Sequence, residues 1–123
     1  MLTIAIRIYG TPSDRLSIKT ISIGIIKEAL AGLPKMDIGE ESVGVFFVPD
    51  YVEEGLGEEI VIFIDELTRN ARDSKDRDLI ARVVSEILKN IFPTTPVIKC
   101  RVQPLGKDDG FYSIEDAKTT STE

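Results

Sequence analysis

The sequence predicts an α+β fold, a two-layer sandwich in which a four-stranded mixed sheet carries two helices on one face. Apolar residues alternate with other residues in four short runs, which is typical of strands, and recur at spacings of three and four in two longer runs, which is typical of helices. The order strand, helix, strand occurs twice. We therefore expect a tandem β-α-β repeat, with the first unit over residues 1–50 and the second over 58–105.

The first unit begins with an alternating run from Leu2 to Tyr9, and Gly10 and Pro12 then interrupt it. A helical pattern follows and ends at "GLPK", and "SVGVFFVPD" (42–50) predicts the second strand of the unit. The spacing predicts that the helix buries an apolar stripe made of Ile18, Ile21, Ile25, Ala29 and Leu33, with Ile26 and Leu30 beside it.

The second unit repeats this order. "EEIVIFIDE" (58–66) predicts a strand and "RNARDSKD" (69–76) a loop, and a helical pattern then runs from Leu79 to Phe92 and stops at Pro93. Val97 to Gln103 predicts the fourth strand. The helix of each unit forms a crossover connection, so the two strands of each unit should be parallel and the crossover right-handed.

A chain of 123 residues can bury one core of ordinary size, so we expect a single domain over residues 1–112. The remaining segment, 113–123, reads "SIEDAKTTSTE" and is polar. We expect this C-terminal tail to be partly disordered, because chain ends without apolar anchors are poorly ordered.

The composition excludes several kinds of site. The formal net charge of -6 disfavours nucleic acid and anionic membrane surfaces as partners, since both require clustered basic groups. The chain contains no histidine, which removes nucleophile systems based on Ser-His or Cys-His and most zinc sites. We therefore expect no metal and no cofactor.

The single cysteine, Cys100, lies in "VIKCRV" and reads as a small buried side chain rather than a reactive thiol. No signal peptide is visible, because Arg7 interrupts the opening apolar run. Lys19, Lys27 and Glu28 fall within the most apolar helical pattern and argue against a membrane span. These features predict a cytoplasmic protein.

The predicted strands are apolar on both faces. In "IVIFI" (60–64) and "VGVFFV" (43–48) apolar residues occupy successive positions, so each face of the sheet needs a cover. Two helices shield only one face, and a second copy of the chain is the natural cover for the other. The sequence therefore predicts a homo-oligomer. The alternative is that the loop "PDYVEEGLGEE" (49–59) or the C-terminal tail packs there.

The chain resembles the tautomerase superfamily, in particular its tandem-repeat members of the macrophage migration inhibitory factor type. The resemblance is carried by "FFVPDYVEEGLGEE", which is similar to the exit from the second strand, by "DSKDRDLIARVVSEIL", similar to the second helix, and by "RVQPLGKDDGFYS", similar to the last strand and its tail. It implies a homotrimer around a central channel, with pockets at the subunit boundaries.

In that family an N-terminal proline, exposed when methionine is removed, acts as base or acid. The matching position here is Leu2, so the catalytic proline is lacking. A bulky residue at this position implies that Met1 is retained, and its terminal primary amine is then the candidate general base. The amine would be displaced by about 3.3 Å, one residue of extended chain.

The resemblance also points to substrate-binding residues. Arg69 and Arg72 are similar to an arginine pair of dehalogenase-like relatives, where two guanidinium groups hold a carboxylate. They imply a small oxo or unsaturated carboxylic acid as ligand. The alternative is that both form surface ion pairs with Asp65, Asp73 or Asp76. Tyr112 is a candidate donor to a bound oxyanion, and Glu115 falls near a C-terminal acid of some relatives.

Two further arginines, Arg7 and Arg101, project from strand faces. They either line the channel with positive charge or pair with Asp65 or Glu66 in a structural role. The glutamates of the loop, Glu53, Glu54, Glu58 and Glu59, look alike in their surroundings and read as a solvated cluster rather than an acid and base pair.

Two functions remain open at this point. The first is a cofactor-independent isomerase-like or lyase-like enzyme, of the keto-enol tautomerase kind, acting on a small oxo acid. The second is a non-catalytic trimer that binds a small ligand or has a structural role. A third arrangement, a split β-α-β fold with a regulatory role, has the same element order, and the order of strands in the sheet separates it from the first two.

Overall fold

Each half of the chain forms a strand, a helix and a second strand. The computed structural model describes residues 2–11, 16–48, 59–106 and 114. The elements in chain order are β1 (Ile4–Tyr9), α1 (Leu16–Ala31), the short 3₁₀ turn η1 (Glu40–Ser42), β2 (Val43–Val48), β3 (Glu59–Glu66), α2 (Ser74–Ile91) and β4 (Val97–Gln103). The predicted order of elements is thus confirmed.

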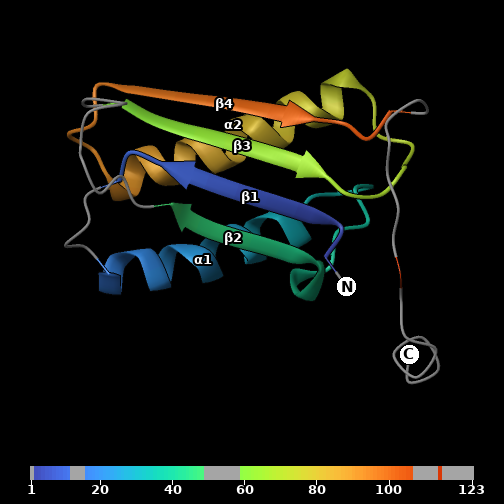
Figure 1. Ribbon diagram of the computed structural model, residues 1–123, viewed down its shortest axis with the longest axis horizontal. Helices are drawn as coiled ribbons and strands as arrows, with labels where there is room; N and C mark the ends of the chain where they lie inside the picture. Colours follow the sequence, from blue (N-terminus) through green and yellow to red (C-terminus); the bar gives the residue numbers. More distant parts are fainter. Residues whose placement is uncertain (1, 12–15, 49–58, 107–113, 115–123) are drawn as a thin grey trace.

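The four strands form one mixed sheet in the order β2-β1-β3-β4 (Figure 1). β1 pairs with β2 and β3 with β4 in parallel, while β1 and β3 are antiparallel. In a split β-α-β unit another strand lies between the two parallel strands. Here the parallel strands of each half are neighbours, so the strand order excludes the split arrangement.

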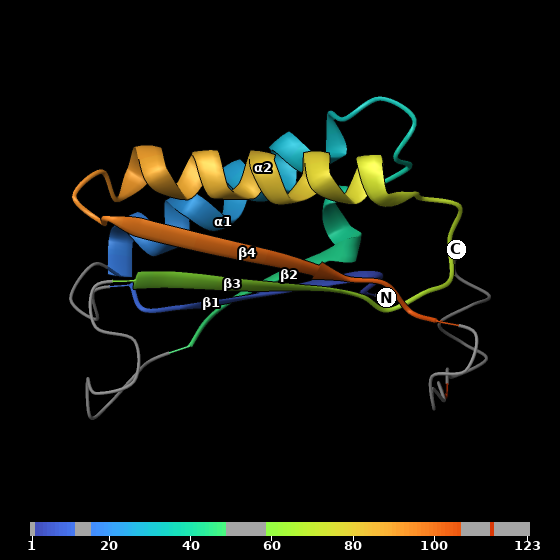
Figure 2. The same ribbon diagram turned by 90° about the horizontal axis from the view of Figure 1, so that it is seen from above.

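Both helices lie on the same face of the sheet (Figure 2). This confirms the two-layer α+β architecture. The core between the layers is built mainly from branched aliphatic side chains, because alternate residues of β1 and β3 point at the helices. Its fully buried members are Ile4, Ile6, Ile8, Ile26, Leu30, Val43, Ile60, Ile62, Ile64, Ile80, Val84 and Leu88.

The buried stripe of α1 differs from the predicted one. Ser22, Ile26 and Leu30 are buried, whereas Ile21 and Ile25 are 62% and 42% exposed. The sequence is ambiguous here because isoleucines occur on more than one side of this helix, so spacing alone did not identify the inner side. Ser22 tolerates burial because its hydroxyl donates to the backbone oxygen of Ile18 at 2.6 Å.

Gly10 ends β1 in a conformation that other residues rarely adopt. Its φ is +88°, and a Cβ atom placed there would lie 2.0 Å from the backbone oxygen of Glu59. A side chain at this position would therefore collide with the start of β3. The glycine allows the chain to leave β1 directly beside the next unit.

The second face of the sheet, which we call the open face, carries the other set of alternating residues. Phe46 of β2 is 48% exposed there, and Leu2 and Val97 are also exposed. Within the described ranges, no helix covers the open face. None of the helices in these ranges is long and apolar enough to cross a bilayer.

Candidate functional site

The chain enters the sheet at a corner formed by three segments. The amide of Thr3 donates to the backbone oxygen of Ser42 at 2.8 Å, and the amide of Leu67 donates to the backbone oxygen of Thr3, also at 2.8 Å. Thr3 is thus held between the start of β2 and the end of β3. Residue 2, at which the resemblance places the proline, lies beside this fixed point.

Leu2 packs against a glycine of the neighbouring strand. A Cβ atom on Gly44 would lie 2.9 Å from Cδ1 of Leu2 and 3.0 Å from Cε2 of Phe46. The missing side chain of Gly44 therefore leaves the space that these two apolar side chains use. Leu2 and Phe46 together form an apolar patch at the β2 edge of the sheet, next to the N-terminal corner.

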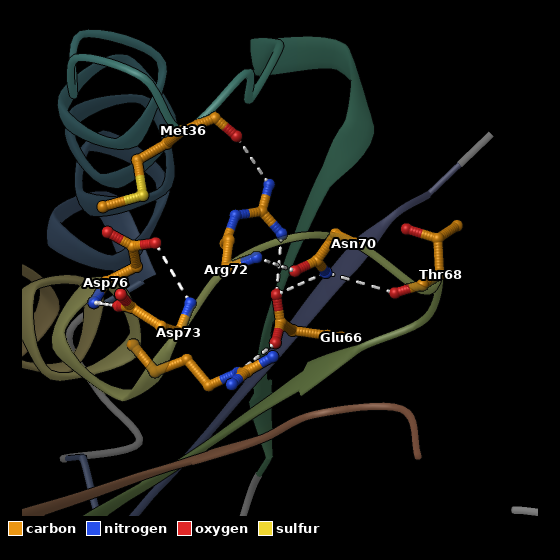
Figure 3. A network of polar contacts seen from close by, with 8 residues as sticks. Met36, Glu66, Thr68, Asn70, Arg72, Asp73 and Asp76 are labelled. Atoms are coloured by element: carbon orange, nitrogen blue, oxygen red, sulfur yellow. Dashed lines mark hydrogen bonds and ion pairs between the residues drawn. The ribbon is translucent and has the colours of Figure 1, made fainter. Parts of the chain in front are cut away.

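A buried carboxylate lies on the other side of the same corner. Glu66 is the last residue of β3, and its side chain is 0% exposed. Its Oε1 accepts from Nε of Arg77 at 2.6 Å, and its Oε2 accepts from Nη1 of Arg72 and Nδ2 of Asn70, both at 2.7 Å (Figure 3). We call these four residues the Glu66 cluster.

Arg72 extends the Glu66 cluster to the linker between α1 and β2. Its Nη2 donates to the backbone oxygen of Met36 at 2.9 Å (Figure 3). The residues on either side, Lys35 and Asp37, have φ values of 64° and 54°, which residues other than glycine rarely adopt. One arginine therefore joins the end of β3 to a strained segment of the linker.

The start of α2 holds the arginines in place. Asp73 is the N-cap: its carboxylate accepts from the amide of Asp76 at 2.9 Å, and the carboxylate of Asp76 accepts from the amide of Asp73 at 3.1 Å. This capping box fixes the first turn of α2. It thereby sets the direction of Arg72 just before the helix and of Arg77 inside it.

Opposing effects act on the ionisation of Glu66. Burial by itself raises the pKa of the carboxyl group, but the hydrogen bonds from Arg77, Arg72 and Asn70 favour the ionised form more strongly. The net pKa of Glu66 therefore lies below its ordinary value. The carboxylate is ionised at neutral pH, and the guanidinium groups of Arg72 and Arg77 are its counter-ions.

The predicted substrate-binding arginines have different partners. Arg69 is exposed, and its Nη2 lies 3.4 Å from the backbone oxygen of Gly106, after β4. Arg72 binds Glu66 and Met36 instead. The residues suggested as ion-pair partners, Asp73 and Asp76, bond to each other's amides in the capping box.

Three other predicted site residues, Met1, Tyr112 and Glu115, lie outside the described residues. Three of the four loop glutamates, Glu53, Glu54 and Glu58, also lie outside the described residues. So do most of the tail 113–123 and residue 112, the predicted end of the domain. These assignments stay predictions.

The strand arginines lie on the open face. Nη2 of Arg7 is 3.1 Å from Oδ2 of Asp65, and the guanidinium lies 5.2 Å from the ring centre of Phe63. Nη2 of Arg101 donates to Oε1 of Gln103 at 2.7 Å. Of the two readings for Arg7, the structural pair with Asp65 is the one that the contacts show.

Other chemistry in the described residues is sparse. Burial raises the pKa of the Cys100 thiol to about 11, although a hydrogen bond with Ser85 opposes this, so the group is protonated and inert at neutral pH. Among the residues that the structure describes, no three Cys, Asp or Glu side chains come together as ligands for a metal ion.

Sequence reasoning missed the Glu66 cluster as a unit. A signal was present, because Glu66 continues the register of Ile60, Ile62 and Ile64 and so had to point into the core. A buried carboxylate needs cationic or polar partners. Basic groups close to it in sequence were available in the following loop and helix, where Arg69, Arg72, Lys75 and Arg77 occur.

No protein-family model matches the sequence, and no curated protein matches it. Solved structures do match. An R7 fused 4-OT wild type asymmetric trimer aligns with a TM-score of 0.68 at 15% identity, over 95% of this chain and 98% of that one. A protein of unknown function from Vibrio cholerae O1 biovar eltor gives 0.67 at 12% identity, over 91% and 84%.

A 5-carboxymethyl-2-hydroxymuconate delta-isomerase aligns with a TM-score of 0.61 at 8% identity, over 97% of this chain and 90% of that one. The 4-OT and isomerase structures belong to the tautomerase superfamily. The predicted resemblance is therefore confirmed at the level of the fold: this chain has the tautomerase-like tandem β-α-β fold.

Proposed function

We propose that this protein is a cytoplasmic homotrimer that binds a small oxo or unsaturated carboxylic acid without a cofactor and lacks proline-dependent catalysis. The single observation that carries the proposal is the corner at Leu2. An isobutyl side chain packed on Gly44 stands where the fold resemblance puts the reactive proline. If Met1 is retained, as the bulky Leu2 implies, the nitrogen of Leu2 is an amide and not the free secondary amine that an N-terminal proline supplies. The corner then has the shape of a tautomerase site without its reagent.

The open face supports the homotrimer. Phe46, Leu2 and Val97 leave apolar surface there, and a partner copy would remove this surface from water. One of the aligned structures is itself described as a trimer. Light scattering should give three chains per particle at micromolar concentration, and a monomer without exposed apolar surface would contradict the proposal.

A pair of substitutions separates the open face from the helix layer. Phe46→Lys places a charge on the open face and should dissociate the trimer, since an unpaired charge in an interface is costly. Ile21→Lys changes an isoleucine on α1 that is 62% exposed, against 48% for Phe46, and should leave the mass of the particle unchanged. Loss of the trimer in both variants would show that the open face is not the interface.

The carboxylic acid is assigned from the arginine pair and from the isomerase name among the aligned structures. Arg69 is the better candidate to hold the ligand's carboxylate, because it is exposed to solvent, whereas the Arg72 side chain is only 10% exposed. Tyr112 and Glu115 are proposed to complete the site. Arg69→Gln should weaken the binding of phenylpyruvate about tenfold or more. Arg82→Gln, on the exposed side of α2, is the matched control, and equal affinity in both variants would remove Arg69 from the site.

Catalysis is tested with a keto-enol assay on phenylpyruvate or 2-hydroxymuconate. The unmodified protein should show no turnover above background, and a Leu2→Pro variant that loses Met1 should gain it. Intact mass spectrometry of both proteins reports the residue at the N-terminus. Turnover by the unmodified protein would contradict the loss of catalysis.

The second candidate is an isomerase-like or lyase-like enzyme whose base is the primary amine of Met1. It is favoured by the double hydrogen bonding of Thr3, which would hold a nearby amine in one place. An α-amino group has an ordinary pKa of about 7.7–8.0 and is partly neutral near pH 7. Turnover by the unmodified protein that disappears on acetylation of the amine would establish this candidate over the first.

A further inference from the structure

We propose that the Glu66 cluster is a latch that positions Thr3, and through it Leu2, at the N-terminal corner. The inference rests on the proposed place of the site, but the latch itself is a property of the fold. Arg72 and Glu66 are then positioning residues, which act on the site through the backbone. Ligand contact is left to other groups.

The Glu66 cluster joins two separate segments. Glu66 ends β3, while the Met36 carbonyl bound by Arg72 lies in the linker between α1 and β2. Met36 itself is buried, and its two neighbours have positive φ values. Such backbone persists only where its surroundings hold it, and the hydrogen bond from Arg72 is such a restraint.

These two segments are also the ones that hold Thr3. The amide of Leu67, which directly follows Glu66, donates to the backbone oxygen of Thr3. The amide of Thr3 donates to the backbone oxygen of Ser42, which lies at the end of the linker that contains Met36. The register pairs Ile4 with Glu66 across the sheet. Any shift of the linker relative to the end of β3 must therefore change the hydrogen bonds on either side of Thr3.

Two guanidinium groups face one carboxylate, and Nε of Arg72 is buried with no hydrogen-bond partner in the described part of the chain. The Arg72 side chain is only 10% exposed. If the Glu66 side chain is removed, two largely buried cations, with side chains 10% and 23% exposed, lose their counter-ion. The space left then has the size and charge for a small carboxylate such as formate or acetate.

The Glu66 carboxylate can be removed by substitution and replaced by a small carboxylate added to the solution. In Glu66→Ala, backbone amide exchange of Thr3 and Leu67 should speed up strongly, and the melting temperature should fall. Sodium formate should restore both in a saturable way, as expected for an anion that binds only the folded state. Sodium chloride at equal ionic strength and acetamide at equal concentration should not. Asp65→Ala, one residue earlier on the open face, is the matched control and should leave exchange at Thr3 unchanged.

A second variant covers the case in which Glu66→Ala does not fold. Arg72→Met keeps the Glu66 pair with Arg77 but loses the bond to Met36, so Thr3 exchange should still rise. Unchanged exchange at Thr3 in Arg72→Met would overturn the latch. So would a foldable Glu66→Ala that chloride rescues as well as formate does.

The latch and the proposed function fail in different ways. In a Leu2→Pro background, adding Arg72→Met should reduce the turnover gained, and it should do so mainly through kcat, because ligand binding groups are unchanged. If exchange at Thr3 responds but Leu2→Pro shows no turnover at all, the latch stands and the proposed site is wrong. If turnover is gained and Arg72→Met leaves it unchanged, the site stands and the positioning role is wrong.

Discussion

The two faces of the sheet treat neighbouring acidic residues differently. Asp65 and Glu66 are consecutive in β3, and each pairs with arginine. The Asp65 side chain is 33% exposed on the open face and has one arginine partner at 3.1 Å. The Glu66 side chain is 0% exposed and has two, at 2.6 and 2.7 Å.

This difference shows how much burial changes the weight of one interaction. An ion pair near water gains little, since solvent screens it and the side chains lose freedom. A buried carboxylate that loses its partners, or buried arginines that lose their carboxylate, keep an uncompensated charge in a poorly solvated place. Substitutions on the covered face, the side of the sheet that packs against α1 and α2, should therefore lower the free energy of unfolding strongly. Substitutions on the open face should act mainly on assembly.

The largest effect is expected for Glu66→Ala. The substitution leaves the largely buried guanidinium groups of Arg72 and Arg77 without their counter-ion and should lower the free energy of unfolding by about 3–5 kcal/mol. Asp65→Ala should lower it by less than about 1 kcal/mol. Urea unfolding at one fixed protein concentration measures both, because assembly makes stability depend on concentration. Equal losses of unfolding free energy in the two variants would contradict the expected effect of burial on the ion pairs.

The next effect concerns apolar side chains of the same strand. Ile62 is fully buried under the helices, while Val61 lies half-buried on the open face. Ile62→Ala should cost about 2–5 kcal/mol of unfolding free energy, through lost burial and the cavity left behind. Val61→Ala should cost about 1 kcal/mol. A larger loss for Val61→Ala would mean that the open face is packed more tightly than the covered one.

Acid should weaken the covered face. Because the pKa of Glu66 is lower in the folded protein than in the unfolded chain, its stabilising effect is complete above the unfolded pKa of about 4.3. It is lost as the pH falls below that value and through the folded pKa. Glu66→Gln should therefore flatten the dependence of unfolding free energy on pH in this acid range. An unchanged acid slope in Glu66→Gln would contradict the lowered pKa.

The smallest effects are expected in β4. Lys99 on the open face lies 3.6 Å from the carboxylate of Glu59 and is largely exposed, so Lys99→Ala should change the unfolding free energy by less than about 0.5 kcal/mol. Cys100→Ala, on the covered face, removes a half-buried thiol and should cost about 1 kcal/mol. The order of these two values is the result to check by urea unfolding.

The order of elements and the two-layer architecture could be predicted from periodicity, because alternation and helical spacing are local properties of the chain. The inner side of α1 could not. Ile21 and Ile25 match a helical stripe as well as Ile26 does, and only the direction in which the helix meets the sheet decides that Ser22, Ile26 and Leu30 are buried.

The candidate site divides in the same way. By itself, the sequence determined that Leu2 stands at the proline position, that two arginines follow β3, and that Glu66 continues an inward-pointing register. Only the tertiary structure decided that Arg72 and Arg77 turn to Glu66 and that Arg72 reaches the linker at Met36. These contacts join segments far apart in the chain. Their geometry depends on how the two layers pack, which no local pattern encodes.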